Sequence, residues 1–118
     1  MEDDYSYIGK SIYFKTNKLF DVPYPISKIL VKNNIIIVLK EMDELLPENE
    51  TDSQNVYSYN LEGDLLWRIT KLNLSEQNTA VYTGIYWENG QLALYNFCGV
   101  EVIVDYRTGE AISTELIK

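Results

Sequence analysis

The sequence predicts an all-β fold, an antiparallel meander of about ten strands that forms a sandwich or an open barrel. Apolar and polar residues alternate with a period of two through much of the chain, as in strands with one buried face. Turn-forming residues separate these segments at short intervals, and no segment has a sustained helical period. We expect a single domain over residues 1–118, in which two four-stranded units follow an N-terminal hairpin. The two units are residues 26–69 and 80–113.

The N-terminal region is expected to contain a loose end and one hairpin. Residues 1–6 are the loose end, and the strands of the hairpin are residues 11–16 and 19–22. The polar pair Asn17-Lys18 is the predicted turn between them. Two prolines follow the hairpin and end it, because proline cannot donate a hydrogen bond to a sheet.

The first unit begins with two strands rich in β-branched residues, residues 26–31 and 35–39. Asn33-Asn34 is a good tight turn between them, because asparagine tolerates the left-handed backbone region. A long polar connection over residues 41–54 leads to the next hairpin.

The second hairpin of this unit, residues 55–69, is strongly predicted. Gly63 lies in its turn, where a positive φ is needed and glycine adopts it without a steric cost. Alternation on both sides of the turn predicts one apolar face, which Tyr57 and Trp67 share. We assign Trp67 to packing between the units.

The second unit follows residues 71–79, which are polar and form either a loop or one helical turn. Two hairpins make up the unit, with Asn89-Gly90 in the first turn and Gly109 in the second. Their four strands are residues 81–87, 91–97, 100–106 and 110–112.

The two units resemble one another in sequence. Residues 31–39 align with residues 87–95, and residues 56–66 align with residues 102–112. The acidic connection is present in one copy only. A unit of about 35–45 residues with four strands has the size of a propeller blade. Two interpretations stay open, a true structural repeat or the similarity that any consecutive hairpins share.

Residues 56–67, Val-Tyr-Ser-Tyr-Asn-Leu-Glu-Gly-Asp-Leu-Leu-Trp, resemble the tryptophan-docking repeat of quinoprotein-type (PQQ-like) β-propellers. An aliphatic-Tyr strand is followed by a glycine and, four residues later, by a tryptophan. Residues 102–113 resemble it too, with Ser113 in place of the tryptophan. The resemblance implies blade-like units, and two such units cannot close a ring. The ligand set of the quinone has no counterpart, so neither this cofactor nor a dehydrogenase activity is expected.

The composition disfavours most catalytic chemistry. The chain has no histidine, which removes histidine-based acid–base catalysis, Ser-His and Cys-His pairs and histidine-containing zinc sites. The lone Cys98 allows neither an internal disulfide nor a thiolate metal cluster, and we expect it to be a small buried apolar residue. No glycine-rich phosphate loop occurs, and no pair of carboxylates is marked for glycoside hydrolysis. We therefore expect no enzymatic activity, no cofactor and no metal site.

The negative charge is concentrated in one stretch. The net charge is −8, and residues 41–64 contain eight acidic and no basic residues. This distribution disfavours binding to nucleic acid or to an anionic membrane and favours a basic protein partner. The acidic N-terminus lacks the features of a secretory signal, and no apolar run is long enough to span a membrane, so we expect a cytoplasmic protein.

The acidic connection is the candidate partner-binding surface. A solvated loop that shields a strand edge is the alternative. Calcium binding is disfavoured, because the glycine and the terminal glutamate of an EF-hand loop are missing. The candidate residues are Glu41, Asp43, Glu44, Glu48, Glu50 and Asp52.

These observations lead to three functional hypotheses. The first is a non-enzymatic protein-binding module, with a bacterial immunity protein that neutralises a basic toxin such as a nuclease as the concrete case. The second is a structural or assembly subunit that self-associates through its strand edges. The third is a carbohydrate or small-ligand site on an aromatic β-face, although core packing is the favoured role for these aromatics. The aromatic residues concerned are Tyr82, Tyr86, Trp87, Tyr95 and Phe97.

Overall fold

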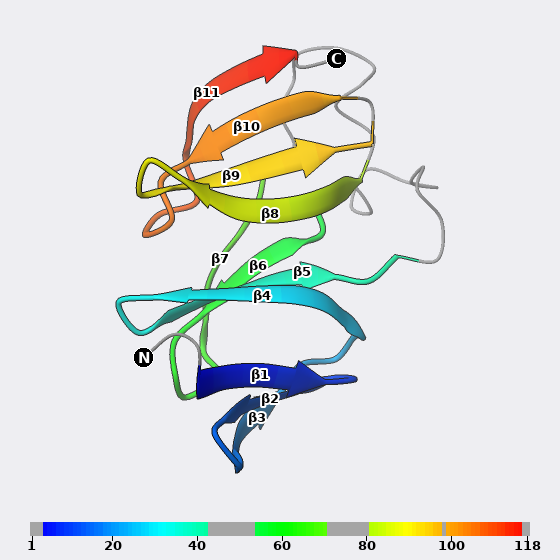
Figure 1. Ribbon diagram of the computed structural model, residues 1–118, viewed down its shortest axis with the longest axis vertical. Helices are drawn as coiled ribbons and strands as arrows, with labels where there is room; N and C mark the ends of the chain where they lie inside the picture. Colours follow the sequence, from blue (N-terminus) through cyan, green and yellow to red (C-terminus); the bar gives the residue numbers. More distant parts are fainter. Residues whose placement is uncertain (1–3, 43–53, 71–80, 98, 117–118) are drawn as a thin grey trace.

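The computed structural model describes residues 4–42, 54–70, 81–97 and 99–116, and these form eleven strands in three antiparallel sheets (Figure 1). The first sheet contains β1 (Tyr5–Ile8), β2 (Ser11–Phe14) and β3 (Asn17–Asp21). The middle sheet contains β4 (Ile26–Lys32), β5 (Ile35–Lys40), β6 (Val56–Tyr59) and β7 (Leu65–Arg68). The third sheet contains β8 (Tyr82–Glu88), β9 (Gln91–Asn96), β10 (Val100–Val104) and β11 (Ala111–Leu116).

The all-β meander is confirmed. Strands that follow one another in sequence are neighbours within each sheet. The three sheets are stacked along the longest dimension of the molecule, which measures 42 × 30 × 22 Å (Figure 1). The strands that the structure describes form no closed barrel, and the arrangement is a sandwich with three layers.

The N-terminal element differs from the prediction. Tyr5 and Ser6, predicted as part of the loose end, belong to strand β1, so a three-stranded sheet replaces the expected hairpin. The first three residues of the predicted loose end lie outside the described residues. Tyr5 and Tyr7 pack against the buried residues between the first two sheets, and this packing stabilises the short strand. The turn between β2 and β3 lies at Lys15-Thr16 and not at Asn17-Lys18, and Lys15 adopts a φ of 54°.

The predicted turns of the two four-stranded sheets are confirmed. Asn33 and Asn34 have φ values of 50° and 64°, as a two-residue turn of this kind requires. Gly63 has a φ of 91° and Gly109 a φ of 79°, so a glycine occupies the left-handed region in both of the matched turns.

The predicted single apolar face of the central hairpin is wrong. Ser58 lies opposite Trp67, and Tyr57 lies opposite Arg68, so Tyr57 and Trp67 point to opposite faces of the middle sheet. The reason is that the middle sheet is buried on both faces. A strand of such a sheet places apolar side chains on both sides, and alternation then no longer separates buried from exposed positions.

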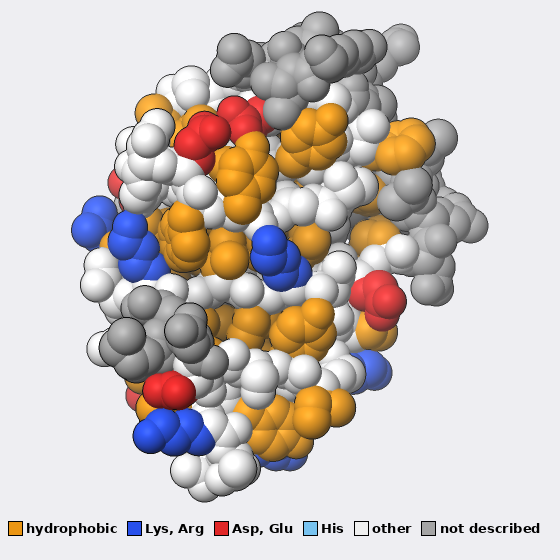
Figure 2. Space-filling model, in the orientation of Figure 1, with side chains coloured by type: hydrophobic (Ala, Val, Ile, Leu, Met, Phe, Trp, Pro, Cys, Tyr) orange, Lys and Arg blue, Asp and Glu red, His pale blue; other side chains and the backbone are white. Residues whose placement is uncertain are grey.

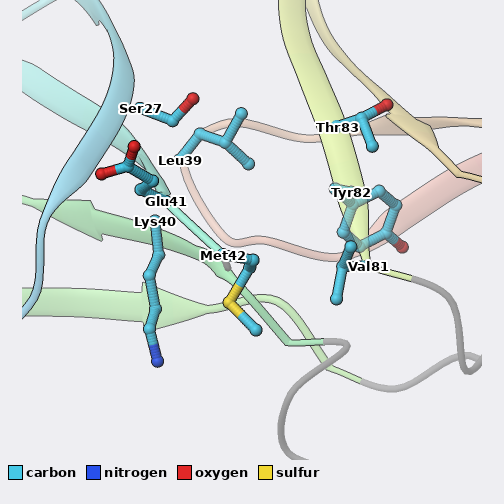
Figure 3. A pocket seen from close by; sticks show the side chains of 8 residues that line it. All are labelled: Ser27, Leu39, Lys40, Glu41, Met42, Val81, Tyr82 and Thr83. Carbon is cyan, nitrogen blue, oxygen red and sulfur yellow. The ribbon is translucent and has the colours of Figure 1, made fainter. Parts of the chain in front are cut away.

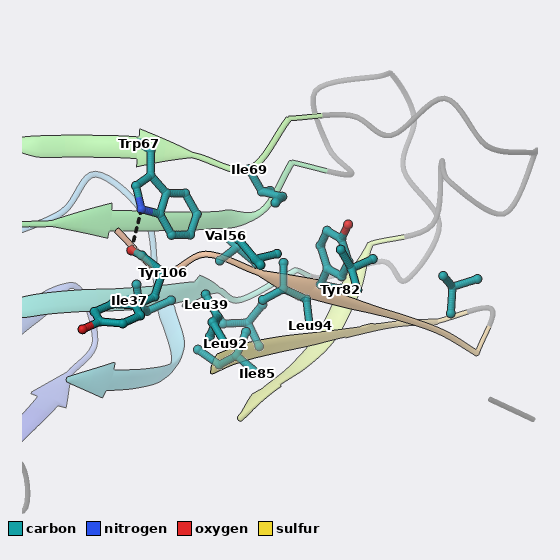
Figure 4. Packing of buried hydrophobic residues seen from close by; sticks show 13 residues of the cluster. Ile37, Leu39, Val56, Trp67, Ile69, Tyr82, Ile85, Leu92, Leu94 and Tyr106 are labelled. Atoms are coloured by element: carbon teal, nitrogen blue, oxygen red, sulfur yellow. Dashed lines mark hydrogen bonds between the residues drawn. The ribbon is translucent and has the colours of Figure 1, made fainter. Parts of the chain in front are cut away.

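Two hydrophobic cores separate the three layers. The first core lies between the first and middle sheets, and its buried residues are Ile12, Val22, Tyr24, Ile26, Val31, Ile36, Val38 and Tyr59. The second core lies between the middle and third sheets (Figure 4). Its buried residues are Ile37, Leu39, Val56, Trp67, Ile69, Tyr82, Ile85, Leu92, Leu94, Val100, Val102, Val104 and Tyr106.

The last two strands of each sheet share one irregularity. In every sheet the final strand contains one extra residue at the same point of the pairing, which is a β-bulge. The extra residues are Leu19, Leu66 and Ile112. Strands β1–β3 therefore correspond to β5–β7 and to β9–β11, and the structural repeat extends into the first sheet.

Matched aromatic residues join successive sheets. The residue after the bulge is Phe20 in the first sheet and Trp67 in the middle sheet. A Cβ atom on Gly63 would lie 2.8 Å from the Phe20 ring, and one on Gly109 would lie 2.6 Å from the Trp67 ring. Each aromatic ring thus packs under the glycine turn of the next sheet, which leaves no room for a side chain there.

Candidate functional site

A pocket of about 260 Å³ opens between the middle and third sheets (Figure 3). It lies where β5 ends and β8 begins. Leu39, Val81 and Tyr82 are buried and form its apolar part. The other lining residues, most of them polar, are Ser27, Lys40, Glu41, Met42 and Thr83.

A buried asparagine fixes the geometry of this pocket. Asn55, which is 1% exposed, donates from Nδ2 to the carbonyl of Tyr82 at 2.9 Å. Its Oδ1 accepts a hydrogen bond from the backbone N–H of Tyr82 at 3.0 Å. One side chain therefore satisfies both backbone groups of Tyr82 and ties the start of β8 to the start of β6. No local sequence pattern signals this long-range contact beyond a polar residue before an apolar strand.

The pocket has a partly polar lining. Ser27 and Thr83 contribute hydroxyl groups and Glu41 a carboxylate, whereas the Lys40 ammonium group lies beside the first core, 5.8 Å from the Tyr24 ring. Burial raises the pKa of Tyr82 to about 12. These groups can orient a ligand by hydrogen bonds and charge.

The acidic connection leaves the fold at the rim of this pocket. Glu41 is exposed there, and its backbone N–H donates to the carbonyl of Pro25 at 2.9 Å. The backbone N–H of Lys40 donates to the carbonyl of Asn55 at 2.9 Å, so the two ends of the connection lie side by side. The other candidate residues lie outside the described residues, namely Asp43, Glu44, Glu48, Glu50 and Asp52.

The aromatic residues of the third sheet do not share one face. Tyr82 belongs to the second core, and Trp87 packs against that core. Tyr86 lies opposite Ala93, which in turn pairs with Ile103 of β10. Tyr86 therefore lies on the other face of the sheet. Phe97 is 47% exposed at the end of β9. The aromatic set is therefore divided between the core and the surface.

A buried carboxylate lies on the outer face of the third sheet. Glu101 is 7% exposed, and the Tyr86 hydroxyl donates a hydrogen bond to it. Tyr95 is the direct neighbour of Glu101 across the β9–β10 pairing. Sequence reasoning missed this contact, because the residues come from different strands.

Trp67 has the packing role that the sequence assigned to it. Its ring is buried in the second core under Gly109. Its Nε1 donates to the carbonyl of Tyr106 at 2.8 Å, so the indole N–H is satisfied within the core (Figure 4).

The surface in Figure 2 carries hydrophobic side chains over all three sheets, with basic and acidic side chains between them. Among the described residues, no three His, Cys, Asp or Glu side chains come close enough together to hold a metal ion. Within the same residues there is no helix with the length and apolar character of a membrane span.

Two solved structures share the fold of this chain. The computationally designed Ika8 protein superposes with a TM-score of 0.62 at 11% identity, over 97% of this chain and 36% of that one. BamB from Moraxella catarrhalis, a PQQ-like β-propeller repeat protein, superposes with a TM-score of 0.56 at 10% identity. That match covers 89% of this chain and 29% of BamB, so the chain spans about a third of the length of either protein.

These matches support a weak resemblance to the blade repeats of such proteins and show the fold alone. A comparison with curated protein sequences gave no match. A family model described as a domain of unknown function (DUF7957) matches residues 3–116. The chain therefore belongs to the DUF7957 family.

Proposed function

We propose that this chain is a non-enzymatic protein-binding module that binds a basic partner through the acidic connection after β5. The concrete case is a cytoplasmic bacterial immunity protein that neutralises a basic toxin such as a nuclease. The observation that carries the proposal is the distribution of charge. Residues 41–54 contain six carboxylates and no basic residue in a chain of net charge −8.

The described residues at both ends of the connection support this proposal. The Lys40 to Asn55 hydrogen bond closes the connection at its base, and Gln54 donates from Nε2 to the carbonyl of Ile69 at 3.1 Å. Asn55 is held in turn by Tyr82. Six carboxylates are thus attached at one firmly held point at the rim of the pocket. A concentration of like charge on one attachment point steers an oppositely charged partner and speeds association.

We also propose that the sheets of this chain are related to tryptophan-docking repeats. Trp67 packs under the glycine turn of the following sheet, and Phe20 does the same one sheet earlier. Blades of this kind supply a stiff scaffold whose connections are free to carry binding residues.

Charge reversal in the acidic connection tests the proposal. The variant Glu48→Lys, Glu50→Lys, Asp52→Lys should weaken binding to a basic protein partner by roughly tenfold or more, with a flatter dependence on salt. The matched control reverses three exposed acids elsewhere, Glu62→Lys, Glu88→Lys, Glu110→Lys, and changes the net charge by the same amount. Equal affinity and equal salt dependence for the two variants would remove the acidic connection as the binding surface.

A second candidate function is self-association through strand edges. Two edge strands carry exposed apolar residues. Leu65 and Leu66 of β7 are 55% and 45% exposed, and Ile112 of β11 is 54% exposed. Apolar side chains on an unpaired edge favour pairing with another chain. Sedimentation at micromolar concentration separates the candidates, because assembly predicts a species larger than a monomer.

A further inference from the structure

Within the described residues, the first sheet has three strands, whereas each of the other two sheets has four. The shared bulge aligns β1 with β5 and with β9. On the edge away from the bulged hairpin, β5 pairs with β4, and β9 pairs with β8. Within the described ranges, no strand pairs with the corresponding edge of β1.

The packing around β1 agrees with this alignment. β8 packs against β5 of the preceding sheet, and β4 packs against β1 in the same way. In Figure 1, β1, β4 and β8 lie one above another on the near side of the molecule. Side chains connect them, since the Tyr7 hydroxyl donates to the Ser27 carbonyl and the Lys28 ammonium group donates to the Ile85 carbonyl. A strand added to β1 would take the position in the first sheet that β4 and β8 have in the other two sheets.

The backbone of β1 has hydrogen-bonding groups directed at its free edge. The Lys15 N–H donates to the Asp4 carbonyl at 2.7 Å, so Asp4 faces β2. Because successive residues of a strand face opposite edges, Tyr5 and Tyr7 direct their N–H and C=O groups away from β2. Gly9 lies in the turn after β1, and its carbonyl accepts a hydrogen bond from the Ile26 N–H at 2.9 Å. The start of β4 thus binds just beyond the end of this edge, before the chain turns into the middle sheet.

We infer that the edge of β1 binds one extended segment of a partner protein as an added antiparallel strand. The backbone groups of Tyr5 and Tyr7 supply the hydrogen bonds, as in other cases of strand addition. β4 shows which side chains such a segment needs toward the following sheet, namely apolar ones such as Leu30, which packs against the second core. This interaction is independent of the acidic connection proposed above.

The charges near β1 define the segment further. Lys10 follows β1 in the turn to β2, and Lys15 lies beside the start of β1. Both side chains are exposed, so a basic group lies near each end of β1. The partner segment is therefore expected to carry carboxylates at its ends and apolar side chains at alternate positions between them. Exposed ion pairs contribute little to affinity, so the lysines select the partner while the backbone hydrogen bonds hold it.

Titration with two synthetic peptides tests this inference on the intact chain. One peptide has the β4 sequence, residues 26–32, and the other has the same sequence with the changes Lys28→Glu and Lys32→Glu. Amide hydrogen exchange measured by NMR should slow at Tyr5 and Tyr7 when the acidic peptide is added. The amides of Ser6 and Ile8 already face β2 and should change little, which makes them internal controls. The acidic peptide should bind about three- to tenfold more tightly than the basic one.

Variants of the peptide and of the chain decide between outcomes. N-methylation of alternate peptide amides should abolish binding in one of the two possible sets and spare the other, because only one set faces β1. The chain variant Lys10→Glu, Lys15→Glu should reverse the preference between the peptides. No slowing at Tyr5 and Tyr7, or equal loss with both methylated sets, would overturn the inference. Protection of these amides without peptide, together with a dimer in sedimentation, would also overturn it and assign the edge to a second copy.

Discussion

The two cores hold the same stack together with different chemistry. Both contain an aromatic ring under a glycine turn, Phe20 under Gly63 and Trp67 under Gly109. The second core is otherwise mostly aliphatic. The first core is rich in tyrosine and contains a hydrogen bond of 2.5 Å between the hydroxyls of Tyr24 and Tyr59.

The tyrosines of the first core also form a stack with two cations. The rings of Tyr24 and Tyr57 are stacked with centroids 4.7 Å apart. The Lys40 ammonium group lies 5.8 Å from the Tyr24 ring, and the Arg68 guanidinium lies 4.8 Å from the Tyr57 ring. The same packing of an aromatic ring under a glycine turn is therefore compatible with two kinds of core, one mostly aliphatic and one rich in tyrosine. The aliphatic core relies on burial and shape, whereas the tyrosine core also depends on satisfied hydroxyls and on charge.

The largest expected effect concerns the second core. Trp67→Ala should lower the free energy of unfolding by about 3–5 kcal/mol, because it leaves a cavity and an unpaired Tyr106 carbonyl. Phe20→Ala should cost less, since Phe20 is only partly buried. Urea denaturation of both variants measures the difference. A loss below about 1 kcal/mol for Trp67→Ala would show that this ring does not join the sheets.

The glycine turns sharpen the comparison with a matched pair. Gly109→Ala should cost about 2–4 kcal/mol, because it combines a positive φ with a clash against the Trp67 ring. Gly90→Ala is the control, since its φ of +78° is almost the same as the +79° of Gly109. At Gly90 a Cβ atom would meet only the Lys32 ammonium group at 3.6 Å. Equal losses of stability in thermal denaturation would argue against close docking at Gly109.

Loss of the Asn55 side chain, which joins the middle and third sheets, should lower the stability by an intermediate amount. Asn55→Ala leaves the buried N–H and C=O of Tyr82 without this partner, and we expect a loss of about 2 kcal/mol. Asn60→Ala is the control, because Asn60 bonds only exposed groups of its own turn. A difference of less than about 0.5 kcal/mol between the variants would contradict the role of Asn55.

The smallest expected change in stability near neutral pH comes from replacing the buried tyrosines, and this change becomes larger at high pH. Burial, followed by the hydrogen bond to Tyr59, raises the pKa of Tyr24, and burial raises the pKa of Tyr82 to about 12. Unfolded tyrosine has a pKa of about 10, so these groups favour the folded state fully below pH 10. This stabilisation is lost as the pH rises through the folded pKa.

Replacing a tyrosine by phenylalanine should therefore flatten the fall of stability above pH 10. For Tyr82→Phe the slope should decrease by up to about 1.4 kcal/mol per pH unit between pH 10 and 12. Guanidinium denaturation at several pH values gives the slope for each variant. A slope equal to that of the unmodified chain would mean that the phenol is as accessible as in the unfolded state.

The sequence predicted those features that depend on neighbouring residues. Asn33-Asn34 and Asn89-Gly90 specify their turns through local backbone preferences, and both turns are found. Strand β1 was missed, because four residues carry too little periodicity to signal a strand without the tyrosine packing that holds them. The faces of Tyr57 and Trp67 were misassigned, because alternation reveals a buried face only when the other face is exposed.

The site was predictable in part for similar reasons. Glu41 could be assigned to an acidic surface from composition alone, and it is exposed at the pocket rim. The hydrogen bonds of Asn55 with Tyr82 and of Tyr86 with Glu101 join residues that are distant in sequence. No local pattern encodes such pairs, since they arise only when the sheets stack.

The central claim is that the middle sheet is a buried layer with Tyr57 on one face and Trp67 on the other. Nuclear Overhauser effects between side-chain protons test it most directly. We predict contacts of the Tyr57 ring with the Tyr24 ring, and contacts of the Trp67 indole with the α-protons of Gly109. Contacts between the rings of Tyr57 and Trp67 would place both on one face and contradict the three-layer stack.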